Sequence, residues 1–158
     1  MPQPNSKFMQ EAIALSLDAI RTGKGGPYGA VVVKDGSVIG RGMNEVTSMN
    51  DPTAHAEMTA IRQACDMIQS WQLPGCELYT SCEPCPMCMG AIYWARLDRV
   101  YYANTKETAA QFGFNSAYFY EQVASTPDQR DMPMILFMSK AAIAAFEEWS
   151  DKTDKQSY

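Results

Sequence analysis

A chain of 158 residues is long enough to fold as one domain around a substantial apolar core. Its net charge of −5 and the lack of a basic stripe make a nucleic-acid partner unlikely on physical grounds. No apolar run is long enough to span a membrane and the N-terminus does not resemble a signal sequence, so we expect a cytoplasmic protein with no membrane association. In that compartment, five cysteines favour metal binding or catalysis over disulfides.

The first half of the chain predicts a helix, a hairpin and a second helix. Apolar residues at helical spacing from Met9 to Ile20 predict the first helix, which "GKGGP" ends. The stretch "YGAVVVKDGSVIGRGMN" is typical of a β-hairpin, with Asp35 and Gly36 in the turn. We expect the second helix to run from about residue 54 to 68.

The second half alternates strands with helices. "GCELYT", "RVYYA" and "PMILFMS" are predicted strands, whereas "PMCMGAIYWAR", "KETAAQF" and "KAAIAAFEEW" are predicted helices. Together with the hairpin, this order predicts an α/β fold: a three-layer α/β/α sandwich with a central mixed five-stranded sheet. We expect residues 1–158 to form a single domain.

The stretch "SCEPCPMCMG" indicates a metal site. Cys85 and Cys88 are three residues apart at a predicted helix start, so their sulfurs lie on the same side of the first turn. Pro86 suits the first helical position, and the helix dipole favours thiolates there. Zinc accepts sulfur and nitrogen ligands, and three protein ligands leave a fourth position for water. His55, the single histidine, is the candidate for the third ligand.

Glu57, two residues after His55, indicates catalysis rather than a structural role. A carboxylate beside a zinc site can take a proton from water and pass it to a leaving group. Zinc lowers the pKa of a bound water from about 15.7 to about 7. The arrangement H-x-E…P-C-x-x-C is the signature of zinc nucleobase deaminases.

Other uses of these residues remain open. A closed structural site could combine the two cysteines with Cys76 and Cys82, but it would leave His55 and Glu57 without a role. Cys82 and Cys85 could form a redox pair, although the proline between them and the third nearby cysteine favour metal ligation. A non-catalytic scaffold stabilised by zinc is a further alternative, and it too leaves Glu57 unexplained.

The segments "DPTAHAEMTAIRQAC" and "TSCEPCPMCMGAIYWAR" resemble the cytidine deaminase superfamily and, within it, the bacterial guanine deaminases. The resemblance covers nearly the whole chain, including "GGPYGAVVVKDG", the "GF" pair at 113–114 and a C-terminal tyrosine. It implies a cytidine deaminase-like fold with one Zn²⁺ per subunit, bound by His55, Cys85 and Cys88. It also implies a hydrolase with Glu57 as the catalytic proton carrier, which converts the free base guanine to xanthine and ammonia.

The resemblance also implies a set of substrate contacts. The side-chain amide of Asn44 would read a purine edge, although an asparagine at a strand end is often only a turn former. The backbone N–H of Ala56 would face a substrate carbonyl, and two aromatic side chains would form pocket walls. The residues expected to bind substrate are Asn44, Ala56, Tyr28, Trp94, Ser116 and Tyr158.

The C-terminal tail, residues 150–158, is expected to reach a partner's active site. The resemblance implies a homodimer, domain-swapped through this tail, in which Tyr158 caps the pocket of the other subunit. By composition alone the tail is typical of a frayed terminus.

One feature departs from the guanine deaminases. Acidic residues commonly follow their "GF" pair, but here Asn115 and Ser116 occupy those positions, and neither titrates near neutral pH. Either Glu57 carries all the proton transfer or the preferred substrate differs from guanine. Alternative substrates are guanosine, cytosine or another aminopurine. A tRNA adenosine deaminase shares the motifs, but the acidic composition argues against an RNA partner.

Overall fold

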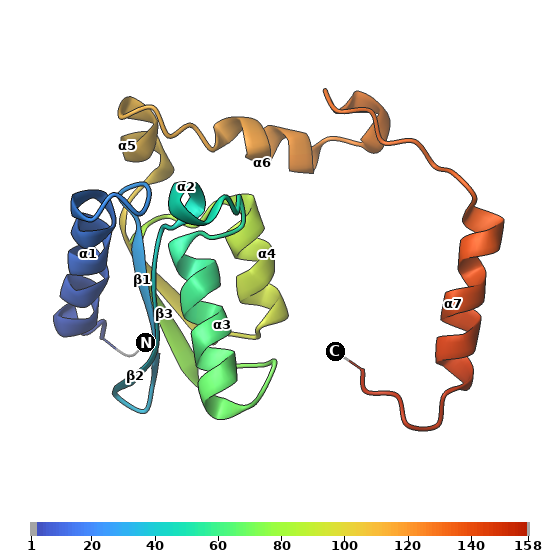
Figure 1. The fold of residues 1–158 in the computed structure, drawn as a ribbon, viewed down its shortest axis with the longest axis horizontal. Coiled ribbons are helices and arrows are strands. Elements are labelled where there is room, and N and C mark those ends of the chain that lie inside the picture. The colour runs from blue at the N-terminus through green and yellow to red at the C-terminus, as the bar shows by residue number, and fades with distance from the viewer. Residues whose placement is uncertain (1–2, 158) are drawn as a thin grey trace. The chain divides into compact units, whose positions relative to one another are not determined.

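A mixed four-stranded sheet forms the core of the computed structural model, which describes residues 3–157 (Figure 1). The strands are β1 (Gly29–Lys34), β2 (Ser37–Met43), β3 (Cys76–Cys82) and β4 (Arg99–Asn104), in the order β2-β1-β3-β4. β1 is antiparallel to β2 and to β3, whereas β3 and β4 are parallel. The sheet belongs to the first of two units, Met1–Tyr120; the second is Glu121–Tyr158.

The hairpin turn between β1 and β2 lies where the sequence predicts it. Asp35 and Gly36 have φ values of 48° and 74°, so both have a left-handed backbone conformation. A two-residue turn of this kind has a twist that matches the strands it joins, and aspartate followed by glycine tolerates it best. The predicted hairpin is confirmed.

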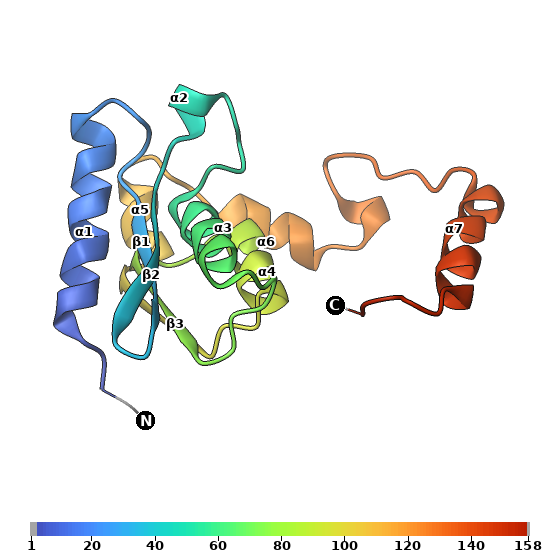
Figure 2. The same cartoon turned by 60° about the horizontal axis from the view of Figure 1, so that its bottom comes forward.

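Helices cover both faces of the sheet in the first unit. Helix α1 (Ser6–Arg21) lies on one face, and α3 (Ala56–Ile68) and α4 (Pro86–Trp94) lie on the other (Figure 2). The predicted layers are therefore confirmed. Three short helices complete this region: α2 (Val46–Met49), α5 (Lys106–Gln111) and α6 (Ala117–Ala124), which continues into the second unit.

Strand β1 contributes buried side chains to two hydrophobic clusters, one on each face of the sheet. Successive side chains of a strand point to opposite faces. Val31 and Val33 therefore pack with residues of α1, while Ala30 and Val32 pack with residues of α3 and α4. All four side chains are buried, which explains why this strand is a continuous apolar run rather than an alternating one.

Small residues form most of the buried face of α1, with Phe8 as the exception. The apolar residues Ile13, Leu17 and Ile20, which help to predict this helix, are 39–49% exposed. The helix lies too close to β1 for large side chains: a Cβ at Gly29 would be 2.2 Å from the carbonyl oxygen of Ala12. The buried residues are Phe8, Ala12, Ser16 and Ala19.

The predicted fifth strand, "PMILFMS", is wrong for the chain as described. Residues 133–138 are in no helix or strand, and Ile135, Leu136 and Phe137 are 81–86% exposed. An apolar segment becomes a strand only where a backbone partner is available, and none pairs with it among residues 3–157. The α/β class with a mixed sheet holds, with four strands instead of five.

The second unit contains the short helix η1 (Pro127–Gln129) and α7 (Ser139–Asp151), which confirms the predicted final helix. None of its described residues, 121–157, is buried. Its exposed large apolar side chains include Phe146 and Trp149 on α7. Throughout the described chain, no helix has both the length and the apolar character that a membrane crossing requires.

Candidate metal centre and active site

Two helix starts bring the predicted metal ligands together. His55 is the N-cap of α3 and Cys85 is the N-cap of α4, and both have extended backbone conformations. Pro86 follows at the first helical position, where its missing N–H has no helical partner to lose. Cys88 then lies in the first turn of α4 and is buried. The side chains can therefore converge from two separate elements.

The three ligand atoms have the spacing of a tetrahedral zinc site. The two sulfurs are 3.7 Å apart, and His55 Nδ1 is 3.6 Å from Cys85 Sγ and 3.5 Å from Cys88 Sγ. Tetrahedral zinc with bonds of about 2.3 Å to sulfur and about 2.05 Å to nitrogen separates two sulfurs by about 3.8 Å, and sulfur from nitrogen by about 3.6 Å. Among the described residues, these three form the group able to hold a metal ion.

The charge state of the cysteines suits a cation. The hydrogen bond between the two sulfurs lowers the pKa of Cys85 to about 4, against the effect of burial and with help from His55. The same hydrogen bond raises the pKa of Cys88, and burial adds to this. The hydrogen bond to Cys85 also raises the pKa of His55. The two sulfurs thus shift each other's pKa in opposite directions, and metal binding requires both of them as thiolates.

Glu57 lies beside this group in the first turn of α3 and is only 5% exposed. Burial is the main cause that raises the pKa of its carboxyl group. The side chain also interacts with Cys85, with His55 and, through a hydrogen bond, with Cys88. A carboxyl group with a raised pKa can hold a proton near neutral pH and give it up to a neighbouring group.

Asn44 has a fixed orientation because its side-chain oxygen is already bonded. Oδ1 accepts the backbone N–H of Gly26 at 3.1 Å and that of Val46 at 3.3 Å. Both partners are donors, so the oxygen must be the atom that faces them, and the NH₂ group is left to donate elsewhere. The fit is close, since a Cβ at Gly25 would lie 2.3 Å from this oxygen. Asn44 is 7% exposed.

Tyr28 and Phe114 form an aromatic pair near the metal-ligand candidates. Their ring centroids are 5.3 Å apart with an interplanar angle of 90°. Tyr28 interacts electrostatically with Glu57 and Cys85, and burial is the main cause that raises its pKa, so its hydroxyl stays neutral. The sequence singles out Phe114 only within the "GF" pair. Gly26 also marks this aromatic pair, because a Cβ at Gly26 would lie 3.4 Å from both rings, so a glycine leaves room for them.

The other predicted substrate contacts do not all lie near the metal-ligand group. Ala56 is buried at the first position of α3, between His55 and Glu57, as expected. Ser116 is half-buried in the segment before α6. Trp94 ends α4, at the opposite end from Cys85, and is 63% exposed, so the structure does not bring it to the ligand group. Tyr158 lies outside the described residues.

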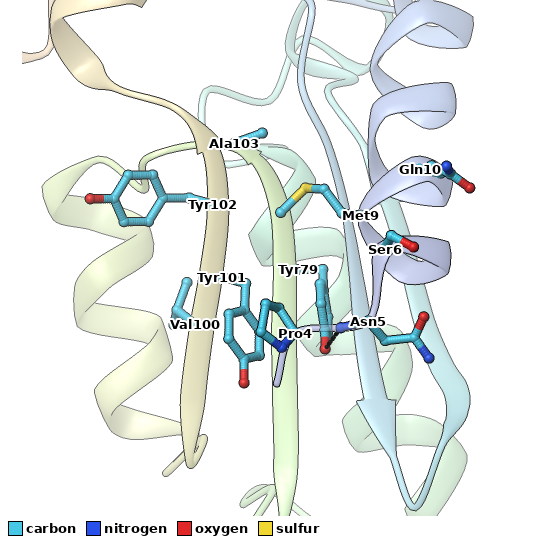
Figure 3. A pocket seen from close by; sticks show the side chains of 10 residues that line it. All are labelled: Pro4, Asn5, Ser6, Met9, Gln10, Tyr79, Val100, Tyr101, Tyr102 and Ala103. Carbon is cyan, nitrogen blue, oxygen red and sulfur yellow. Dashed lines mark hydrogen bonds between the residues drawn. The ribbon is translucent and has the colours of Figure 1, made fainter. Parts of the chain in front are cut away.

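A hollow of about 530 Å³ lies elsewhere, beside β4 on the side of the sheet that carries α1 (Figure 3). Tyr79, Tyr101 and Tyr102 line it from β3 and β4, and Asn5 and Met9 line it from the N-terminal side. None of the predicted site residues belongs to its lining. The hollow is therefore a separate surface feature of the first unit.

The family comparison agrees with the geometry. Two sulfurs and one imidazole at helix starts, beside a buried glutamate, define a site of the zinc-dependent deaminase class. The model of the "Cytidine and deoxycytidylate deaminase zinc-binding region" family matches residues 2–104, and the chain belongs to this family.

Individual relatives within this family include guanine deaminases. The chain is 45% identical over 151 residues to a guanine deaminase of Bacillus subtilis, a match that covers 96% of this chain and 97% of that one. A crystal structure of guanine deaminase from that organism has a TM-score of 0.95 at 44% identity and covers 99% of both chains. A guanine deaminase structure from Nitrosomonas europaea has a TM-score of 0.68 at 29% identity, with 73% of this chain and 67% of that one covered. The resemblance to the guanine deaminases is thus confirmed.

The tRNA-specific enzymes match less of the chain. A tRNA-specific adenosine deaminase of Agrobacterium fabrum is 51% identical over 76 residues, which cover 48% of this chain and 50% of that one. This match covers about half of each chain, so it supports a common substrate less than the guanine deaminase match does.

Proposed function

We propose that the protein is a zinc-dependent hydrolase that converts guanine and water to xanthine and ammonia. The observation that carries this proposal is the tetrahedral spacing of His55, Cys85 and Cys88 beside the buried carboxyl group of Glu57. The guanine deaminase of Bacillus subtilis, which aligns with 96% of the chain, supports guanine as the base.

His55, through Nδ1, and the sulfurs of Cys85 and Cys88 would hold one zinc ion. When bound, zinc lowers the pKa of water so that it can act as a nucleophile near neutral pH. Glu57 moves the protons: a carboxylate oxygen accepts one from water and passes it to the amino group that leaves as ammonia. Its burial keeps bulk water from competing for that proton, since the Glu57 residue is only 5% exposed.

The purine is recognised by groups that already have fixed orientations. Asn44 donates its NH₂ group to an acceptor on the purine edge, because Gly26 and Val46 occupy its oxygen. The backbone N–H of Ala56, at the start of α3, donates to the substrate carbonyl, since first-turn N–H groups lack helical partners. Tyr28 forms one wall of the pocket, and Ser116 remains a predicted contact, whereas Trp94 lies at the far end of α4 from Cys85.

Ammonia release by the zinc-loaded protein tests this function. Guanine should be the best substrate in a panel with adenine, cytosine, guanosine and 2,6-diaminopurine. Glu57→Gln should keep its zinc content and lose turnover by roughly 10²–10⁴-fold, the usual contribution of a proton-transfer group. A higher kcat/KM for cytosine or adenine would overturn the proposed substrate, and full activity of Glu57→Gln would overturn the proposed proton carrier.

We also propose a homodimer in which the second unit of one chain packs on the first unit of the other. The support is complementary surface: residues 132–138 and α7 expose large apolar side chains, and the outer edge of β4 has no strand partner among the described residues. The hollow lined by Tyr79, Tyr101 and Tyr102 lies next to that edge. In this assembly residues 133–138 supply the missing fifth strand, residues 150–158 reach the partner's pocket, and each copy completes one deaminase domain.

Light scattering tests the assembly. The full chain should elute as a dimer, and a chain that ends at residue 131 should not. A monomeric full chain would overturn the exchange of the second unit. Because two cysteine thiolates must stay reduced to bind zinc, we further propose that the protein works in the cytoplasm, where thiols are kept reduced.

A further inference from the structure

The connection between β3 and α4 decides where Cys85 lies. Only Glu83 and Pro84 separate the end of the strand at Cys82 from the N-cap residue Cys85. Proline fixes its own φ, but its ψ remains free to rotate the next peptide group. The position of the first metal-ligand sulfur therefore depends on what holds the peptide group between Pro84 and Cys85.

A tyrosine from a distant segment holds that peptide group. The hydroxyl of Tyr120 donates a hydrogen bond of 2.6 Å to the carbonyl oxygen of Pro84, which is buried. This oxygen and the Cα of Cys85 belong to the same planar peptide unit. A hydrogen bond to the oxygen therefore sets the direction in which Cys85 leaves the backbone.

Glu83 fixes the other end of the connection. Its backbone N–H donates to the carbonyl oxygen of Asn104 at 2.8 Å, which extends the pairing of β3 with β4. Its carboxylate accepts the backbone N–H of Lys106 at 3.0 Å and the Lys106 ammonium at 3.2 Å. The same ammonium lies 5.7 Å from the ring centroid of Tyr120. Lys106 therefore contacts both Glu83, which belongs to the connection, and Tyr120, which binds Pro84.

We propose that Tyr120 is a positioning residue for the metal centre, which aligns Cys85 through the Pro84 carbonyl and is itself held in place by Lys106 and Glu83. The proposal rests on the metal site of the proposed function. Partners behind metal ligands commonly change metal affinity by roughly 10–100-fold when they are removed.

The variant Tyr120→Phe isolates this hydrogen bond. It keeps the ring and its contact with Lys106 and removes only the hydroxyl, so the fold should survive. Competition with a chromophoric chelator should show zinc bound roughly 10–100-fold more weakly than in the unchanged protein. The cobalt-substituted variant should also have an altered visible spectrum, because that spectrum reports ligand geometry. Tyr93→Phe is the matched control: its side chain lies on α4, is 75% exposed and should change neither readout.

A purely structural role for Tyr120 predicts a different result. It would lower the melting temperature of the zinc-free and zinc-loaded forms equally and leave zinc affinity and the cobalt spectrum unchanged. That result, or equal effects of Tyr120→Phe and Tyr93→Phe, would overturn the proposal. A positioning role predicts a smaller zinc-induced rise in melting temperature. These readouts measure metal binding alone, so a failure here leaves guanine deamination standing, whereas an unchanged protein that binds no zinc would overturn both.

Discussion

Replacing Gly42 by alanine tests whether the contact of β2 with α3 positions the active-site residues. A Cβ at Gly42 would lie 2.0 Å from the carbonyl oxygen of Ala56, and such contacts essentially never fall below 3.0 Å. The start of α3, which carries His55 and Glu57, must therefore move by about 1 Å. Overpacking of this kind costs about 1–3 kcal/mol, and for a chain of this size we expect the melting temperature to fall by roughly 2–12 °C. A 1 Å displacement at a catalytic group can lower kcat/KM by about 100-fold.

Two other glycines supply the controls for this measurement. A Cβ at Gly40 would lie 2.2 Å from the carbonyl oxygen of Ala60, one turn further along α3, so Gly40→Ala should destabilise similarly but reduce kcat/KM less. Gly90 is in α4 with nothing within 4 Å, and Gly90→Ala should raise stability by about 0.5–1 kcal/mol without loss of activity. The assays are thermal unfolding and ammonia release. The reasoning is refuted if Gly42→Ala melts lower but retains full kcat/KM, or if Gly40→Ala loses equal activity.

Three further predictions concern the site and the tail. Burial raises the pKa of Glu57, so from about pH 4.3, the ordinary value, up to its folded-state pKa this group binds more protons in the folded zinc-free protein than in the unfolded chain. Its contribution to stability therefore falls as pH rises through this range. Zinc-free Glu57→Gln should therefore melt higher than the unchanged protein at pH 7 and no higher near pH 4; a constant difference across this range would contradict the buried position. Asn44→Asp keeps an oxygen for Gly26 and Val46 but loses the NH₂ donor, and should lower kcat/KM for guanine by roughly 100-fold; an unchanged value would show that the donor does not touch substrate. Deleting residues 150–158 should raise KM or lower kcat, and mixing this chain with full-length Glu57→Gln should restore activity; absence of rescue would argue against exchange of the tail.

Local sequence patterns predict the first unit well because its structure follows from local chemistry. Asp35 and Gly36 tolerate a left-handed backbone, so the position of the hairpin turn follows from two residues. Pro86 and the cysteine before it mark the start of α4, which places the thiols on one turn. The metal group is predictable for the same reason, since a single histidine leaves no choice of imidazole.

Features that depend on distant partners could not be predicted in this way. "PMILFMS" has the composition of a strand, yet the described chain offers it no edge to pair with. The buried face of α1 depends on how closely Gly29 lets the helix approach, which periodicity does not report. The bond between Tyr120 and Pro84 joins residues 36 positions apart that share no motif.

The exposed apolar segment 134–138 makes the single chain prone to aggregation. Residues 134–138, "MILFM", carry no charge, and Ile135, Leu136 and Phe137 are almost fully solvated. Such a segment, made alongside an open sheet edge, is a template for uncontrolled stacking of chains. In the proposed dimer this segment is covered, so overproduction that outpaces dimer formation should deposit the protein in inclusion bodies.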